Sequence, residues 1–71
     1  MTNSIALRDW ITRKGYKLKA IAEKLGITPY SLQKKIDNES EFKASEIATF
    51  VNDLGMDTPD RDEIFFARNV E

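Results

Sequence analysis

The side chains best suited to bind a ligand are concentrated in residues 17–37, the run KLKAIAEKLGITPYSLQKKID. Lysines recur through this run, and their ammonium groups could meet phosphate. The whole chain has no cysteine and no histidine, which removes disulfides, the usual zinc sites, thiol nucleophiles and the commonest general base. No nucleophile–base pair is apparent either. We therefore expect a binding protein that is not an enzyme and needs no cofactor.

The spacing in this run predicts two short helices joined by a tight turn. Ala22 is small where the helices must cross, Gly26 supplies the positive φ that ends the first helix, and Ile27 fills the gap between them. Thr28 then caps the second helix, and Pro29 suits its first turn. This is the layout of a DNA-binding helix-turn-helix, in which the second helix enters the major groove. An ordinary helical hairpin without a nucleic-acid role is the alternative.

The rest of the chain predicts an all-α fold in a single domain over residues 1–71. The expected helices cover about 4–14, 17–25, 28–36, 44–54 and 58–67. Ile5 or Ala6 begins an apolar stripe on the first helix that makes Trp10 a core residue. In the fourth helix, apolar residues gather on one face from Ile47 to Leu54, and Thr58 is the expected cap of the fifth.

Charge is divided unevenly along the chain, although the net charge is only −1. Residues 1–35 hold eight Lys or Arg against two acids, whereas residues 36–71 hold three against ten. The basic half contains the predicted helix-turn-helix, so a positive face could meet phosphate while the acidic half faces away. A solvated surface without a partner is the alternative for either half.

The N-terminal segment is interrupted by charged residues such as Arg8 and Asp9, and no apolar run reaches the length of a signal sequence or a membrane span. We therefore expect no membrane association and a location in the cytoplasm.

Three features together resemble a known family: the tract Ile21–Ile27, the Ser31-Leu32 pair followed by Ile36, and the two added helices. They are similar to the Cro and repressor class of phage helix-turn-helix regulators, over about residues 4–54. Within that class the chain is most similar to small Cro-like or modulator-of-repression proteins of temperate phages of Gram-positive bacteria. Such proteins help to decide between lysogeny and lytic growth. The resemblance implies a lambda-repressor-like five-helix domain, operator DNA as ligand and a bacterial host cell.

The resemblance also implies which side chains contact DNA. Base contacts would come from the start of the third helix, where Gln33 could bond an adenine edge, Lys34 a guanine or phosphate, and Tyr30 a thymine methyl. Backbone contacts would come from Lys17 and Lys19 at the start of the second helix. The remaining contacts would be made by Thr28 and Pro29. At the second helix the family usually has Ser or Thr followed by Gln, which grips phosphate, and Lys17 and Leu18 stand there instead.

Two adjacent aromatic residues close the predicted fifth helix. Neighbouring helical positions are about 100° apart, so Phe65 and Phe66 cannot both point into a small core. With Val70 they form a candidate protein interface, unless both rings cover the end of the bundle.

The sequence as a whole leads to two candidate functions. The first is a Cro-type regulator that binds operator half-sites as a homodimer. The second is a modulator of repression that binds a cognate phage repressor and binds DNA weakly alone.

Overall fold

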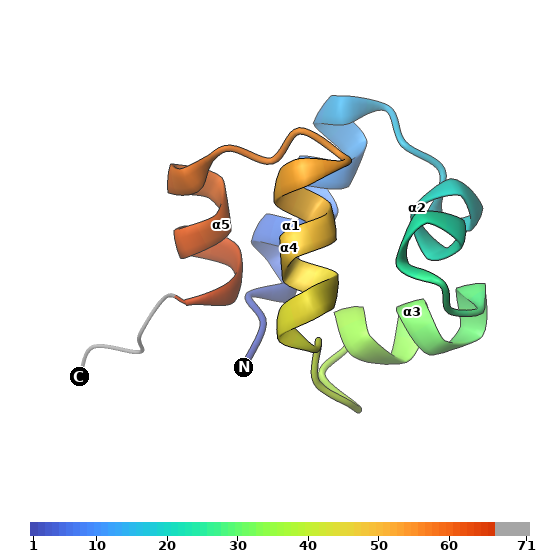
Figure 1. The fold of residues 1–71 in the computed structure, drawn as a ribbon. Helices are drawn as coiled ribbons and strands as arrows, with labels where there is room; N and C mark the ends of the chain where they lie inside the picture. The colour runs from blue at the N-terminus through green and yellow to red at the C-terminus, as the bar shows by residue number, and fades with distance from the viewer. Residues whose placement is uncertain (67–71) are drawn as a thin grey trace.

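A computed structural model of the chain describes residues 1–66, which form five α-helices and no β-strand. The helices are α1 (Ser4–Lys14), α2 (Leu18–Leu25), α3 (Pro29–Ile36), α4 (Ala44–Asn52) and α5 (Thr58–Phe65). Helices α1 and α4 occupy the middle of the molecule (Figure 1). The α2–α3 pair packs at one end, and α5 packs on α1 and α4 at the other. The predicted all-α class is confirmed.

One apolar core joins the five helices. Its buried side chains are Leu7, Trp10, Ile11, Ile21, Ala22, Leu32, Ile36, Phe50, Leu54, Met56, Ile64 and Phe65. Trp10 is fully buried, as predicted, and its ring centroid lies 5.8 Å from that of Phe50 in an edge-on contact. Edge-on aromatic pairs of this kind contribute about 0.5–1.5 kcal/mol beyond the area they bury. The Trp10–Phe50 contact therefore links α1 and α4 across the core.

The helix ends follow local signals with two corrections. Gly15 ends α1 with a φ of 75°, and its N–H donates to the Ile11 carbonyl at 3.0 Å. Thr58, predicted to cap α5, instead occupies its first turn, because the Asp57 carboxylate accepts the Asp60 N–H at 2.9 Å. A charged acceptor also favours the positive end of the helix dipole. Helix α4 ends at Asn52, two residues earlier than predicted.

Of the two candidates for the first apolar position of α1, the structure selects Ala6. Ala6 packs against the core, whereas Ile5 is 83% exposed. Helix α5 ends at Phe65, earlier than predicted, with Phe66 as its C-terminal cap residue. Val70 and the predicted last helical position, 67, lie outside the described residues. Within residues 1–66, the helices all lack the length and apolar character needed to cross a bilayer.

Candidate nucleic-acid interface

The turn between α2 and α3 is held by backbone and cap hydrogen bonds. Gly26 adopts a φ of 74°, and the following Ile27 N–H donates to the Ala22 carbonyl at 3.0 Å. The Thr28 hydroxyl accepts the Ser31 N–H at 3.0 Å, which confirms the predicted cap. Ala22 is buried beside the turn. These contacts set the direction in which α3 leaves the turn.

A buried ion pair fastens the far end of α3 to α4. The Lys35 Nζ lies 2.7 Å from both carboxylate oxygens of Glu46, and both side chains are buried. The same carboxylate accepts the Lys43 N–H at 2.8 Å, which satisfies a free donor at the start of α4. Lys43 has no side-chain acceptor of its own. Glu46 therefore serves both the ion pair and the start of α4.

Sequence reasoning missed this pair. Lys35 belongs to the basic half of the sequence, yet it lies three positions after Leu32 on the face of α3 that meets the core. Glu46 lies four positions before Phe50 on the inner face of α4. Opposite charges at core-facing positions of two helices were therefore the signal that could have identified it.

A second set of polar contacts joins the end of α3 to α1. Arg8 Nη2 donates to Asp37 Oδ1 at 2.6 Å, and the Gln33 amide donates to the other carboxylate oxygen at 3.3 Å. The Arg8 guanidinium, followed by the Gln33 amide, holds the pKa of the Asp37 carboxyl below its ordinary value. The amide of Gln33 is thus oriented by a carboxylate that α1 holds in place.

Asn38 adds a further connection that the sequence did not reveal. It has a φ of 64°, in the left-handed region, and its side-chain amide exchanges two 2.9 Å hydrogen bonds with the backbone of Thr2. The sequence places Asn38 in a polar loop and gives no sign of a contact with the N-terminal segment. The structure instead uses it to tie the chain after α3 to the N-terminal segment. The C-terminal end of α3 is therefore anchored, and its first turn projects.

Three of the predicted DNA-contacting side chains share one face of α3. Tyr30, Gln33 and Lys34 are spaced at i, i+3 and i+4, which brings them together on a helix. Tyr30 is 73% exposed, whereas Gln33 and Lys34 are half-buried. The Lys34 Nζ lies 5.4 Å from the centroid of the Tyr30 ring. Pro29 is exposed beside them at the start of the helix.

The basic half of the sequence is partly neutralised in the fold. Three of its basic residues approach carboxylates of the acidic half: Arg8 with Asp37, Arg13 with Asp60 and Lys35 with Glu46. Five lysines make no ion pair with a described residue: Lys14, Lys17, Lys19, Lys24 and Lys34. The remaining positive charge therefore lies on α2, on α3 and at the end of α1.

The start of α2 has no side-chain cap. Lys17 occupies the cap position with extended backbone angles. Its side chain accepts no hydrogen bond from the helix, because an ammonium group has no acceptor. Lys17 and Lys19 are both exposed. Their ammonium groups are available to a ligand. The first backbone N–H groups of α2 have no side-chain acceptor.

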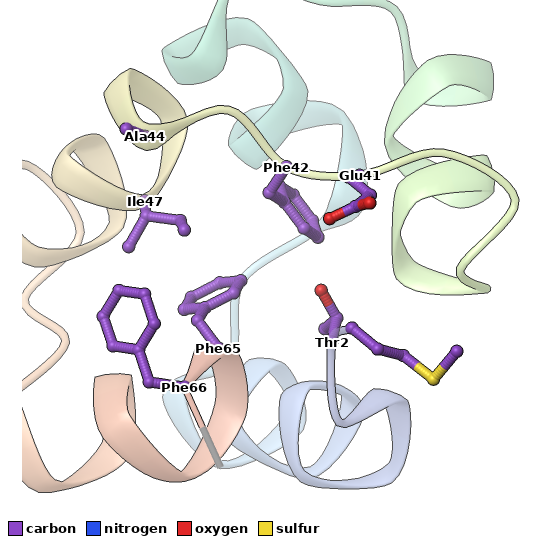
Figure 2. A pocket seen from close by; sticks show the side chains of 8 residues that line it. Thr2, Glu41, Phe42, Ala44, Ile47, Phe65 and Phe66 are labelled. Carbon is purple, nitrogen blue, oxygen red and sulfur yellow. The ribbon is translucent and has the colours of Figure 1, made fainter. Parts of the chain in front are cut away.

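The predicted protein-interface residues lie at the other end of the molecule. Phe65 is only 8% exposed and packs against Phe42 and Phe50, with ring centroids 5.3 and 5.4 Å away. Phe66 is 55% exposed and turns toward Ile47, as Figure 2 shows. One ring thus enters the core and the other stays on the surface.

Comparisons of the chain with protein-family models, with curated proteins and with solved structures found no match.

Proposed function

We propose that this chain is a transcriptional regulator of the Cro and repressor class that takes part in a phage lysis–lysogeny switch. In this proposal α2 and α3 form the helix-turn-helix of a lambda-repressor-like domain, and α3 binds operator DNA in the major groove. The protein acts as a homodimer on paired half-sites, in the cytoplasm of a bacterial host. The proposal rests on residue patterns and on the geometry of α3.

The observation that carries the proposal is the outward face of α3. Helix α3 is held at its C-terminal end by Lys35 and Asp37, and it carries the side chains of Tyr30, Gln33 and Lys34 on one face. Tyr30 is exposed there, and Gln33 and Lys34 are half-buried. The neighbouring helix α2 also carries exposed lysines. Phosphate contacts position a protein on a duplex and base contacts specify the sequence, and this surface offers groups for both tasks.

Gln33 is the side chain best suited to read a base. Its amide nitrogen uses one hydrogen on Asp37, which leaves the second hydrogen and the carbonyl oxygen unused. Those two groups match the N7 acceptor and N6 donor of adenine. Asp37 would therefore hold the amide in an orientation that suits bidentate binding, so that less conformational freedom is lost when DNA binds.

The test is fluorescence anisotropy with labelled DNA from upstream of the gene, titrated at several salt concentrations. Gln33→Ala and Lys34→Ala should each weaken operator binding by roughly 1–3 kcal/mol where a base contact is lost. Loss of a phosphate contact at Lys34 should also reduce the salt slope by about one. Thr12→Ala, an exposed change on α1, serves as the control and should leave affinity unchanged. Full affinity in both α3 variants would exclude the proposal.

A second function is favoured by the exposed Phe66. In this alternative the chain is a modulator of repression that binds a partner repressor and binds DNA weakly alone. A half-exposed aromatic ring beside apolar side chains of α4 is a feature of protein-binding surfaces. The uncapped start of α2 at Lys17 also weakens the helix that would brace α3. Co-elution with a cognate phage repressor, at micromolar concentration, tests this alternative, and separate elution would reject it.

A further inference from the structure

The side-chain amide of Gln33 has a fixed direction. Its Nε2 donates to Oδ2 of Asp37 at 3.3 Å. An ionised carboxylate only accepts hydrogen bonds, so the amide nitrogen must face Asp37 and the amide oxygen must point away from it. A turn of the amide by 180° would place its oxygen against the carboxylate. The donor end and the acceptor end of Gln33 are therefore not interchangeable.

The carboxylate that imposes this direction is itself held from α1. Arg8 Nη2 donates to the other oxygen of Asp37, Oδ1, at 2.6 Å. This bond, and then the bond from Gln33, keeps the pKa of the Asp37 carboxyl below its ordinary value of 3.8. Asp37 is therefore ionised at neutral pH and acts as an acceptor only. Each of its oxygens has a donor, one from α1 and one from α3.

An amide held in one direction restricts the base that it can bind. The oxygen of Gln33 needs a donor on the base edge, and its remaining N–H needs an acceptor. Adenine offers both in the major groove, through N6 and N7, whereas guanine offers two acceptors and cytosine a donor alone. Because one hydrogen of Nε2 is bound to Asp37, the amide cannot give both hydrogens to guanine. Adenine is therefore the base that Gln33 selects.

The N6 group of adenine carries two hydrogens with different positions in a duplex. One bonds to thymine, and the other lies in the major groove beside N7. A methyl group on N6 of a paired adenine replaces the groove hydrogen, so the oxygen of Gln33 would meet a methyl group where it needs a donor. A free amide could turn its oxygen away and keep the contact with N7. Asp37 opposes that turn.

We infer that Asp37 is a positioning residue that makes DNA binding by this chain sensitive to N6-methylation of the adenine that Gln33 contacts. Asp37 acts through Gln33 and touches no base itself. The inference rests on the first proposed function and adds a form of regulation to the same site. Methylation of the operator would then lower its occupancy without any change in the protein.

The experiment compares duplexes that differ only in methyl groups. DNA from upstream of the gene is amplified with N6-methyl-dATP in place of dATP, so the position of the operator need not be known. A second duplex, made with 5-methyl-dCTP, carries methyl groups elsewhere in the major groove. Fluorescence anisotropy with the full chain is measured at low salt, where phosphate contacts keep weak binding measurable. The N6-methyl duplex should bind at least about tenfold more weakly than unmodified DNA, and the 5-methylcytosine duplex should bind equally well.

Three variants assign the effect to the Asp37–Gln33 contact. Gln33→Ala removes the amide, so the ratio of the affinities for unmodified and N6-methyl DNA should fall to about one. Asp37→Asn can donate to the Gln33 oxygen and lets the amide turn, so the ratio should fall at least about threefold. Glu39→Gln is the matched control, because it neutralises a nearby exposed carboxylate without an ion pair to a described residue. It should keep the parent ratio.

The possible results separate this inference from the first proposed function. If the unmodified duplex is not bound, that function is rejected and the inference with it. If unmodified and N6-methyl DNA bind equally, or 5-methylcytosine weakens binding as much, the inference alone is overturned. A methyl effect that persists in Gln33→Ala would belong to another side chain, which also overturns it. A merely structural role of Asp37 would weaken binding of both duplexes in Asp37→Asn and leave their ratio unchanged, against the positioning role.

Discussion

The two ends of this small bundle use their apolar residues differently. In the α2–α3 pair the large aliphatic side chains Ile21, Leu32 and Ile36 are fully buried, and polar groups face outward. At the α4–α5 end the core takes Phe50 and Phe65 but leaves Phe66 half exposed. The exposed aromatic residue of the α2–α3 end, Tyr30, carries a hydroxyl and lies beside Lys34, whereas the exposed ring of Phe66 carries no polar group. The first end therefore offers a ligand charge and hydrogen bonds, and the second offers an apolar surface. One short chain therefore offers two chemically distinct surfaces.

The largest effect is expected where the two ends are joined. Glu46→Ala leaves the Lys35 ammonium buried without its partner and removes the acceptor of the Lys43 N–H. Loss of one member of a buried ion pair costs about 3–5 kcal/mol, a large share of the stability of a small domain. Urea denaturation followed by circular dichroism measures the loss.

Two further variants separate charge from hydrogen bonding at this site. Glu46→Gln keeps an acceptor for the Lys43 N–H and should destabilise less than alanine. Lys35→Met combined with Glu46→Gln removes the buried ammonium as well, and should recover most of the lost stability. If the double variant is no more stable than Glu46→Gln alone, the buried charge is not what makes the single change costly.

A smaller and opposite effect is expected at the start of α2. Lys17 already has the extended backbone of a cap residue, so Lys17→Ser can accept a hydrogen bond from an N–H of the first turn. Stability should rise by about 1 kcal/mol, measured by urea denaturation. Lys19→Ser is the matched control, since it removes the same charge without providing a cap. Equal stability changes in the two variants would mean that capping is not the cause.

Lys17→Ser also sharpens the comparison of the two ends. If α2 lies against phosphate, the loss of this lysine should lower the salt slope of DNA binding by about one while the helix itself becomes more stable.

The helix ends were predictable because their causes are local. Gly15, Gly26 and the Thr28 cap each act within a few residues, so the sequence alone located the ends of α1 and α2 and the start of α3 to within a residue. The start of α5 shows the limit of such signals. Asp57 and Thr58 are adjacent and both are good caps, and only the path of the backbone decides between them.

Contacts between distant residues were not predictable from local patterns. The Lys35–Glu46 pair and the Asn38–Thr2 bonds join segments whose approach depends on the packing of whole helices. The same applies to Phe65, because the rotation of α5 on α1 and α4 decides which of two adjacent rings is buried. The candidate α3 residues came from a resemblance, and their role in DNA binding stays a prediction.

The smallest effect is expected at Asp37, an acidic residue in the second half of the sequence whose carboxylate binds Arg8 in the first half. Its carboxylate has a lowered pKa in the folded chain because Arg8, and then Gln33, bind the ionised form. The stability it contributes is present above its ordinary pKa of 3.8 and is lost as the pH falls through the lowered value. Asp37→Asn should therefore be slightly less stable than the parent at pH 7 and equally stable at the acid end, in urea titrations across pH. Glu39→Gln, a nearby exposed carboxylate with no such contacts, should follow the parent curve.

The proposal that Gln33 binds a base gives a second readout for the same variant. Because asparagine cannot accept from both Arg8 and Gln33 in the same way, Asp37→Asn should also reduce discrimination at the base that Gln33 would contact, while the salt slope stays the same. A lowered slope with discrimination intact would place Asp37 in the general electrostatics of the α2–α3 end and not in base reading.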